Sequence, residues 1–434
     1  MTFVLVNVYI CSFSCYIDYV IKIQLIGVFN MNIVWGLVGI AVVLGIAFLS
    51  SNNRKAINPR TILGGLAIQV AFAFIVLKWE AGKAALQWLT NGVTNIINYA
   101  NEGINFLFGG MFAAKGIGFV FAFQVLPVVI FFSALISVLY YIGVMQWVIK
   151  MIGGPLAKLL GTSKAESMSA AANIFVGQTE APLVIRPYLS KMTQSELFAV
   201  MTGGLASVAG SVLVGYSLLG VPLEYLLAAS FMAAPAGLVM AKMIVPETEP
   251  IKEDEHFEME KDEESTNVID AAARGASDGL KLALNIGAML LAFIALIALI
   301  NGLLSGVGNL FNYDGLTLQK ILGFVFAPIA FAIGVPWSEA VTAGGFIGQK
   351  LILNEFVAYS SFAPQIPELS AKTVAIVSFA LCGFANISSM GILLGGLGSL
   401  APNRRSDIAR MGLKAVLAGM LASLLSASIA GMFI

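Results

Sequence analysis

The sequence predicts an all-helical polytopic membrane protein. Hydrophobic residues make up 59% of the chain and charged residues only 11%, whereas a soluble domain carries roughly 25% charged residues. Apolar stretches of about 20 residues, the length needed to cross a bilayer, recur along the chain, and none alternates like an outer-membrane strand. The chain of 434 residues therefore accommodates about eight spans together with shorter re-entrant and interfacial helices.

The rest of the composition excludes several classes of function. The formal net charge is zero, so the chain has no basic footprint for nucleic acid. The three cysteines, Cys11, Cys15 and Cys382, provide neither a disulfide framework nor zinc-site spacing. The single histidine, His256, lies in the most charged segment. We therefore expect no enzyme, because metal and nucleophile-histidine chemistry would need such groups inside the spans.

The first part of the chain predicts two spans joined by a basic loop. Residues 1–30 form an N-terminal extension to which we assign no function. Residues 33–49 and 62–77 are each apolar and close to the length of a span. The loop between them carries Arg54, Lys55 and Arg60. Because lysine and arginine accumulate on the cytoplasmic side, the chain enters this loop from outside.

Two further elements complete a scaffold region that we expect to cover residues 31–149. Residues 84–108 mix apolar side chains such as Trp88 with asparagines such as Asn95, which suits a helix lying in the outer interface. A long apolar span is expected at 117–149, and its basic end lies in the cytoplasm.

Residues 177–182 (GQTEAP) conflict with their apolar surroundings. An amide, a hydroxyl and a carboxylate stand in a row, and Pro182 interrupts any helix. An ionisable group at membrane depth costs at least about 2.5–3.5 kcal/mol, so it indicates a functional site. The alternative is that Glu180 lies in a loop facing water. Because the flanking apolar stretches are too short to cross, we expect a re-entrant hairpin at 163–190, entered from the cytoplasm.

The hairpin belongs to a first transport repeat at 150–245. Residues 151–160 are short and cationic, so we expect them at the interface. The span at 197–219 is rich in glycine and serine. It either packs a neighbouring helix through small residues or is unwound near Ser207, and the sequence favours neither. The span at 221–244 then returns to the cytoplasm.

The second half follows an acidic linker at 246–278, whose first part, 246–270, holds eleven of the 24 acidic residues. Residues 279–310 add one scaffold span. A second transport repeat is expected at 311–434. Its elements are an amphipathic helix at 316–333 broken by Pro328, a second hairpin at 337–362, a span at 374–397 interrupted at 383–389, and a last span at 413–434. Counting crossings places both termini outside.

The two transport regions contain an internal repeat. Pro155, Gly161 and Glu166 recur as Pro328, Gly334 and Glu339 at a separation of 173, and Gly177-Gln178 recurs as Gly348-Gln349. Chance similarity between apolar segments is the alternative. An odd number of crossings separates the copies, so the second hairpin enters from the opposite side. This inverted arrangement is typical of secondary transporters, whose site lies at the midplane between discontinuous helices.

The polar residues of the two repeats indicate a neutral solute. The expected donors and acceptors are Gln178, Thr179, Glu180, Glu355, Asn386 and Ser389. An anionic substrate would instead need guanidinium groups or bare helix N-termini. Carboxylates accept from vicinal hydroxyls, and an amide can both donate and accept toward a heterocycle. Phe384 either packs against a flat face of the solute or against neighbouring helices.

Coupling requires a cation. Oxygen atoms of Asn173, Val176, Ser207 and Val208 suit sodium, because unwound backbone supplies carbonyl ligands in transporters. A proton carried by Glu180 or Glu355 is the alternative.

Three motifs resemble the signatures of the concentrative nucleoside transporter family: GQTEAPL at 177–183, NEFVAY at 354–359 and GFAN at 383–386. The resemblance extends from about Met31 to the C-terminus. It implies a homotrimer of eight spans with two opposed hairpins, in which a transport domain moves like an elevator past a scaffold. Residues 1–30 and the long acidic segment depart from the family pattern as we understand it.

The resemblance also implies residue roles. Gln178, Thr179 and Glu180 would contact the base, with Val212 packed beside it. Glu355, Asn386 and Ser389 would hold the ribose hydroxyls, with Phe384 lining the pocket. Asn173, Val176, Ser207 and Val208 match the family's sodium site in character, which favours sodium over protons.

We therefore expect a sodium-coupled nucleoside symporter in a bacterial inner membrane, with a proton-coupled symporter as the alternative. An intramembrane enzyme would need a catalytic base that the spans do not provide. A channel would need a filter-like run of carbonyls or a ring of charges.

Overall fold

The computed structural model describes residues 31–112, 119–250, 258–259, 264–311 and 315–434, and in these residues all regular structure is helical. The predicted all-α membrane fold is therefore confirmed. Within these described residues, seven helices are long and apolar enough to cross a membrane. They are Met31–Leu49, α2 (Pro59–Leu77), α4 with α5 (Phe121–Gln124 and Leu126–Tyr141), α9 with α10 (Gln194–Ala206 and Gly210–Leu218), α11 (Leu223–Ile244), α12 (Val268–Leu310) and α18 (Arg405–Ala430).

Two shorter apolar helices, α16 (Ala371–Leu381) and α17 (Ser389–Leu400), lie where the sequence predicts a further, interrupted span. The short 3-10 helix η1 (Arg54–Ala56) lies in the basic loop between the first two spans, and η4 (Pro402–Arg404) lies between α17 and α18.

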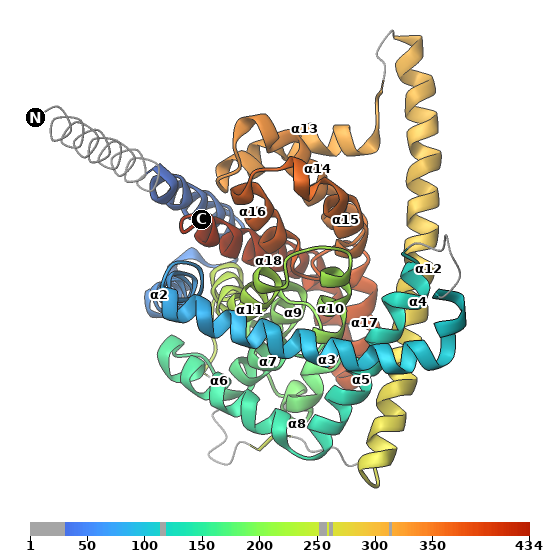
Figure 1. Ribbon diagram of the computed structural model, residues 1–434. Helices are drawn as coiled ribbons and strands as arrows, with labels where there is room; N and C mark the ends of the chain where they lie inside the picture. Colours follow the sequence, from blue (N-terminus) through green and yellow to red (C-terminus); the bar gives the residue numbers. More distant parts are fainter. Residues whose placement is uncertain (1–30, 113–118, 251–257, 260–263, 312–314) are drawn as a thin grey trace, which may run out of the picture.

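The spans divide into an inner and an outer group (Figure 1). In the most apolar part of each span, 94% of the residues of α9 with α10 and 89% of those of α11 are buried, against 22% for α12. The inner spans α9, α11 and α18 pack on one another. The long helix α12 stands along one side, and α3 (Glu80–Phe112) crosses the front of the bundle. A side chain that is apolar and exposed needs lipid or another subunit to cover it, so the outer group faces the membrane.

Close packing of α12 against α5 depends on two glycines. A Cβ atom at Gly275 would lie 2.5 Å from the Cβ of Ser137, and one at Gly279 would lie 2.7 Å from that of Ser133. The small residues on both helices therefore let the two backbones approach closely.

The first hairpin follows the amphipathic helix α6 (Val144–Leu160). It consists of α7 (Lys164–Ala172), a turn, η2 (Ala181–Ile185) and α8 (Arg186–Leu189). A capping box starts α7. The Glu166 carboxylate accepts from the Ser163 backbone N–H at 2.7 Å, and Ser163 Oγ accepts from the Glu166 N–H at 3.4 Å.

The second hairpin follows α13 (Leu318–Ala332), whose axis makes a bend of 116° with that of α14 (Trp337–Ile352). The chain reverses at Leu353 and Asn354 and continues as α15 (Glu355–Phe362) and η3 (Ala363–Glu368). Asn354 Oδ1 accepts from the Val357 N–H at 2.8 Å and so caps α15.

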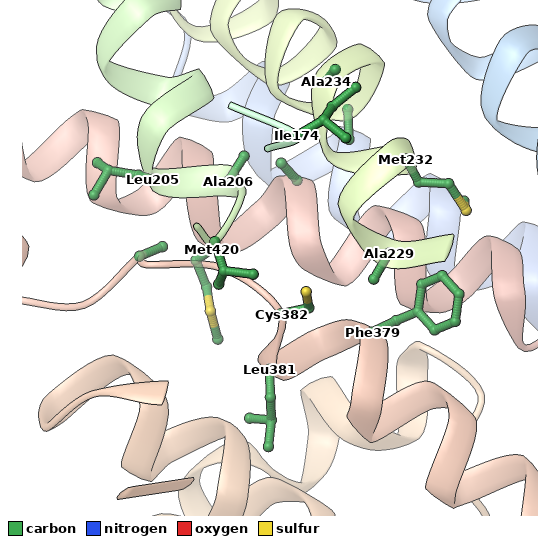
Figure 2. Packing of buried hydrophobic residues seen from close by; sticks show 14 of the residues in the cluster. Ile174, Leu205, Ala206, Ala229, Met232, Ala234, Phe379, Leu381, Cys382 and Met420 are labelled. Carbon is green, nitrogen blue, oxygen red and sulfur yellow. The ribbon is translucent and has the colours of Figure 1, made fainter. Parts of the chain in front are cut away.

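Two interrupted spans lie next to each other in the core. The helix α9 ends at Ala206 and α10 begins at Gly210, which confirms the unwinding near Ser207 rather than a continuous helix. A Cβ atom at Gly383, in the break after α16, would lie 2.9 Å from the carbonyl oxygen of Ala206. Figure 2 shows Leu205, Ala206 and Cys382 among the buried residues of this region.

The predicted span at 117–149 is wrong in its length. The helix α5 ends at Tyr141, and Gly143 adopts a left-handed φ of 84° before α6 begins. A glycine tolerates this conformation, which turns the chain out of the span. The predicted interfacial piece at 151–160 is accordingly the second half of α6, and the expected boundary at residue 150 falls inside that helix.

Other boundaries also differ from the expectation. Pro328 lies inside α13 and does not break it, because the helix continues to Ala332. The helix α12 begins at Val268, inside the segment expected to be a linker, where the Asn267 side chain caps it. The helix α18 begins at Arg405, eight residues before the start expected for the last span at 413.

The internal repeat is visible in the backbone. Pro155 and Pro328 lie inside α6 and α13, and the helices are followed by Gly161 at φ 68° and Gly334 at φ 110°. The Gly-Gln match is an exception. Residues 177–178 lie at the tip of the first hairpin, whereas residues 348–349 lie inside α14, which extends further before its turn.

Candidate functional site

One cavity of about 460 Å³ receives side chains from both hairpins and both interrupted spans. A pocket of a few hundred Å³ is typical for a small organic ligand. All eight residues predicted to contact substrate line it: Gln178, Thr179, Glu180, Val212, Glu355, Phe384, Asn386 and Ser389. Glu180 and Glu355, far apart in the sequence, therefore share one chamber.

Glu355 is the best-defined acceptor in this cavity. It is 6% exposed and lies at the start of α15, where the helix dipole favours a negative charge. Its Oε1 accepts from the Tyr216 hydroxyl at 3.0 Å, and its Oε2 accepts from Asn386 Nδ2 at 3.2 Å. These two donors fix the carboxylate and leave its remaining lone pairs for hydroxyl groups of a solute.

The break before α17 presents a second polar group. Asn386 Oδ1 accepts from the Ser389 N–H at 2.9 Å and from the Ser388 hydroxyl at 2.7 Å. The Ser389 hydroxyl donates to the Phe384 carbonyl at 2.6 Å. The network holds Asn386 and Ser389 in fixed orientations beside Glu355, because Asn386 Oδ1 and the Ser389 hydroxyl have partners within the same turn and Asn386 Nδ2 donates to Glu355.

The tip of the first hairpin lines another part of the cavity wall. Gln178 is buried, and its Oε1 has no hydrogen-bond partner, so it is free to accept from a bound solute. Thr179 donates its hydroxyl to the Glu180 carboxylate at 2.9 Å. Glu180 is exposed in the turn of the hairpin, and it lines this cavity.

Two glycines make room for this tip. A Cβ atom at Gly204 on α9 would lie 2.8 Å from the Cβ of Gln178, and one at Gly396 on α17 would lie 2.6 Å from Thr179 Cγ2. Both distances are shorter than van der Waals contact, so these spans need glycine to let the hairpin reach the cavity.

The charge of the cavity is negative. Among the described residues that line it, the ionisable side chains are the carboxylates of Glu180 and Glu355. This arrangement disfavours an anionic solute, and it suits one rich in hydroxyl and amine donors.

Of the four residues expected to bind the coupling ion, Ser207 and Val208 lie in the break between α9 and α10, and Asn173 and Val176 lie in the first hairpin. None of these four residues lines the cavity described above. Asn173 is 1% exposed, and its Oδ1 has no hydrogen-bond partner, whereas its Nδ2 donates to the Ser169 carbonyl at 2.9 Å. A Cβ atom at Gly203 would lie 3.4 Å from Asn173 Nδ2, and the Gly203 carbonyl accepts from the Ser207 hydroxyl at 3.1 Å. Val176 and Val208 are also buried.

An unpartnered buried oxygen next to unwound backbone fits a hard cation such as sodium. A bound ion would serve as the partner of that oxygen. It would remove the free-energy cost of leaving a buried acceptor without a hydrogen bond.

Sequence reasoning missed the contribution of α12 and Tyr216. Leu282, Asn285 and Met289 of α12 line the cavity from the outer group of helices. Asn285 could have been found, because a polar residue within a long apolar span indicates a functional position. Tyr216 gave no such signal, since only the tertiary structure brings it to Glu355.

Comparisons with known proteins agree with this geometry. The chain matches the family description "Na+ dependent nucleoside transporter" in its N-terminal part over residues 38–111 and in its C-terminal part over residues 225–431. The region between, residues 122–222, matches a gate domain described as "Nucleoside recognition".

Several curated relatives are similar over nearly the whole chain. An uncharacterised transporter of Bacillus subtilis is 63% identical over 407 residues, covering 93% of this chain and 100% of the relative. A nucleoside permease of Helicobacter pylori is 53% identical over 410 residues, covering 92% and 97%. Mouse sodium/nucleoside cotransporter 1 is 41% identical over 413 residues, which cover 91% of this chain and 62% of the mouse protein.

Solved structures of the protein CNTnw are similar in fold. The inward-facing, substrate-bound state has a TM-score of 0.88 at 58% identity, covering 93% of this chain and 98% of that one. A double variant in an outward-facing state has a TM-score of 0.90 at 58% identity, covering 93% and 99%.

Proposed function

Because the chain belongs to the family of Na+ dependent, concentrative nucleoside transporters, we propose that it is a sodium-coupled symporter that imports nucleosides. Family membership makes it a multi-pass membrane transporter of nucleosides and not an enzyme. The ion, the mechanism and the residue roles are our proposal. The observation that carries it is the cavity in which all eight expected substrate residues meet.

The nucleoside lies between the two hairpins. Its base faces Gln178, Thr179 and Glu180, whose amide, hydroxyl and carboxylate can bond to a heterocycle edge directly or through water. Its ribose hydroxyls donate to Glu355, and Asn386 and Ser389 support them. The side chains that pack against the nucleoside are Val212 beside the base and Phe384 at the pocket wall.

Sodium binds between the first hairpin and the break in α9 and α10. The Asn173 and Ser207 side chains and the carbonyls of Val176 and Val208 supply oxygen ligands. A backbone hydrogen bond of 2.9 Å from the Gly210 N–H to the Phe175 carbonyl already joins these two segments. Sodium binding therefore orders the hairpin against the span, and nucleoside binding completes the cavity.

The proposed transport cycle moves one part of the protein past another. The moving part consists of the repeats at 150–245 and 311–434, which contain most of the buried spans. The scaffold consists of 31–149 and 279–310, and the acidic segment 246–278 links the halves. Similarity to both inward-facing and outward-facing structures supports alternating access, and the elevator-type movement is inferred from the family resemblance.

The scaffold also provides a surface for assembly. Leu291, Leu299 and Leu303 of α12 are 78%, 61% and 65% exposed. Apolar side chains at this exposure need lipid or protein around them. We propose a homotrimer assembled through the scaffold in a bacterial inner membrane, with both termini outside.

Thermal stability of the purified protein tests this function. Ligands that bind the folded state raise the unfolding temperature. We expect a panel of nucleosides to stabilise the protein more strongly in sodium chloride than in choline chloride at fixed pH. Stabilisation that ignores sodium but follows pH would support the proton-coupled alternative, and no stabilisation by any nucleoside would reject the proposed substrate.

A further inference from the structure

Lys350 is a fully buried cation in the last turn of α14. Its Nζ donates to the Ala380 carbonyl at 2.8 Å and to the Ser423 hydroxyl at 3.0 Å. Both acceptors are neutral. A buried ammonium needs such compensation, because transfer of a charge out of water is costly.

The Ala380 carbonyl is available because α16 stops. In a continuing helix it would accept from the Phe384 N–H, but that N–H donates instead to the Ser207 carbonyl at 3.0 Å. The Ser423 hydroxyl is itself 3.4 Å from the Cys382 carbonyl, which it can also serve as a donor. The ammonium therefore binds a backbone carbonyl that lacks a helical hydrogen-bond partner because α16 ends.

The same architecture occurs in the first repeat. There the Gly210 N–H, just after the break in the span, donates to the Phe175 carbonyl of the first hairpin at 2.9 Å. In the second repeat the Ile387 N–H, within the break, donates to the Leu351 carbonyl of the second hairpin at 3.1 Å. Each hairpin is thus joined to its interrupted span by one backbone hydrogen bond at a corresponding place.

The two repeats differ in the polar group next to this junction. In the first, Asn173 precedes the junction and directs its amide toward α9 near Gly203, with its Oδ1 unpartnered. In the second, Lys350 precedes the junction and directs its ammonium toward α16 at Ala380. One repeat thus offers an oxygen that lacks a partner, and the other contains a positive charge.

Lys350 acts on the substrate cavity from behind it. It lies in the last turn of α14, and Glu355 begins α15 on the other side of the turn at Leu353 and Asn354. Lys350 itself does not line the cavity, so its effect on the nucleoside passes through the position of other groups.

We propose that Lys350 is a tethered cation, which occupies in the second repeat the place that the coupling ion takes in the first. Its ammonium holds the second hairpin against the break in α16 and α17, as a metal ion would do with the same carbonyl oxygens. Lys350 is therefore a positioning residue for Phe384, Asn386 and Glu355. One repeat then requires an external ion and the other does not. This inference rests on the proposed sodium coupling for the first repeat.

Three substitutions at Lys350 separate charge from volume. Lys350→Met fills the same space without charge, Lys350→Ser removes both and leaves room for a hydrated ion, and Lys350→Arg keeps the charge. Lys372→Met is the matched control, because Lys372 is a half-exposed lysine on α16 that bonds to Asn32 at 2.7 Å, away from the cavity. Nucleoside uptake is measured in proteoliposomes across a sodium series.

For Lys350→Met we expect the nucleoside KM to rise by about tenfold or more, the scale of a lost hydrogen bond to a charged group. For Lys350→Ser we expect nucleoside uptake to depend more steeply on the sodium concentration. A second ion site increases the maximum Hill coefficient for sodium. Lys350→Arg and Lys372→Met should keep the wild-type sodium curve. Sodium-dependent thermal stabilisation is measured alongside, since it reports ion binding even in a variant that has lost transport.

A wild-type nucleoside KM in Lys350→Met would overturn the positioning role. A sodium dependence in Lys350→Ser no steeper than wild type, in both uptake and thermal stability, would overturn the tethered-cation assignment. A failure of the proposed function would be distinguishable from both of these results. It would appear in the wild-type protein, as nucleoside uptake that does not depend on sodium.

Discussion

The backbone N–H of Phe384 donates to the backbone carbonyl of Ser207 at 3.0 Å. This hydrogen bond joins the interruption of α16 and α17 directly to that of α9 and α10. Ser207 belongs to the proposed sodium site, and Phe384 lines the proposed nucleoside cavity. When one interruption becomes more ordered, this hydrogen bond transmits the change to the other interruption. We infer that this link couples ion binding to substrate binding.

The first prediction concerns Glu355→Gln. The two carboxylate oxygens accept from Tyr216 and from Asn386. An amide in the same place is neutral and has only one oxygen, so it cannot accept from both Tyr216 and Asn386. We expect nucleoside uptake to fall by about tenfold or more, since hydrogen bonds to a charged group contribute about 1.5–3 kcal/mol.

The measurement is uptake of radiolabelled nucleoside, with size-exclusion chromatography to check assembly. Glu368→Gln is the control, because Glu368 is exposed in η3 and does not line the cavity. Unchanged uptake in Glu355→Gln would remove Glu355 from the substrate site.

The second prediction concerns the sodium requirement. Asn173→Ala removes a buried oxygen without a partner, and Ser207→Ala removes a hydroxyl beside the break. We expect both variants to need more sodium for half-maximal uptake, because each loses one oxygen ligand. Ser378→Ala is a matched control for Ser207→Ala. Ser378 is also buried and also donates to the carbonyl four residues earlier, Val374, but in α16 before its break.

The assay is uptake at a fixed nucleoside concentration and pH, with sodium replaced stepwise by choline. If the sodium curves of Asn173→Ala and Ser207→Ala coincide with that of the wild type, proton coupling becomes the better explanation.

The third prediction uses two adjacent glycines on α17. A Cβ atom at Gly396 would lie 2.6 Å from Thr179 Cγ2, whereas nothing lies within 4 Å of one at Gly395. Gly396→Ala therefore forces Thr179 to move and disturbs its 2.9 Å hydrogen bond to Glu180. We expect a raised nucleoside KM in Gly396→Ala, as an overpacked contact costs about 1–3 kcal/mol.

Gly395→Ala is the control, and alanine in an exposed helix position is neutral or mildly stabilising. Equal KM values for the two variants would show that the first hairpin does not need its packing on α17 to bind substrate.

The fourth prediction concerns stability rather than transport. Lys242 Nζ on α11 lies 2.7 Å from the Glu166 carboxylate on α7 and donates to the Ser195 hydroxyl on α9 at 2.9 Å. Both charged side chains are almost completely buried. Lys242→Met leaves Glu166 buried without its partner, and breaking a buried ion pair costs about 3–5 kcal/mol.

We expect a clearly lower unfolding temperature for Lys242→Met, and partial recovery in the double variant with Glu166→Gln. Lys281→Met serves as the control, because its ion pair with Asp278 is exposed and contributes little. Equal unfolding temperatures for Lys242→Met and Lys281→Met would contradict a stabilising role for the buried pair.

Periodicity and composition predicted the helices well where a span is long and apolar. The expected spans at 33–49, 62–77 and 221–244 correspond to Met31–Leu49, α2 and α11. Boundaries failed where the decisive feature is a backbone conformation. Nothing in the hydropathy marks the left-handed Gly143 that ends the third span, because the residues on both sides are equally apolar.

The sequence by itself determined the membrane class, the presence of an internal repeat and the chemistry of the polar residues, because an amide or carboxylate within an apolar chain is visible wherever it lies. From the repeat a shared chamber could be expected. The sequence left open whether the span at 197–219 is unwound, and the structure decided this at Ser207. Only the tertiary structure decided which groups meet. Tyr216 at Glu355, Asn285 in the cavity wall and Lys350 at the Ala380 carbonyl join residues from separate elements. Such contacts depend on how whole helices pack in three dimensions, and local patterns do not contain that information.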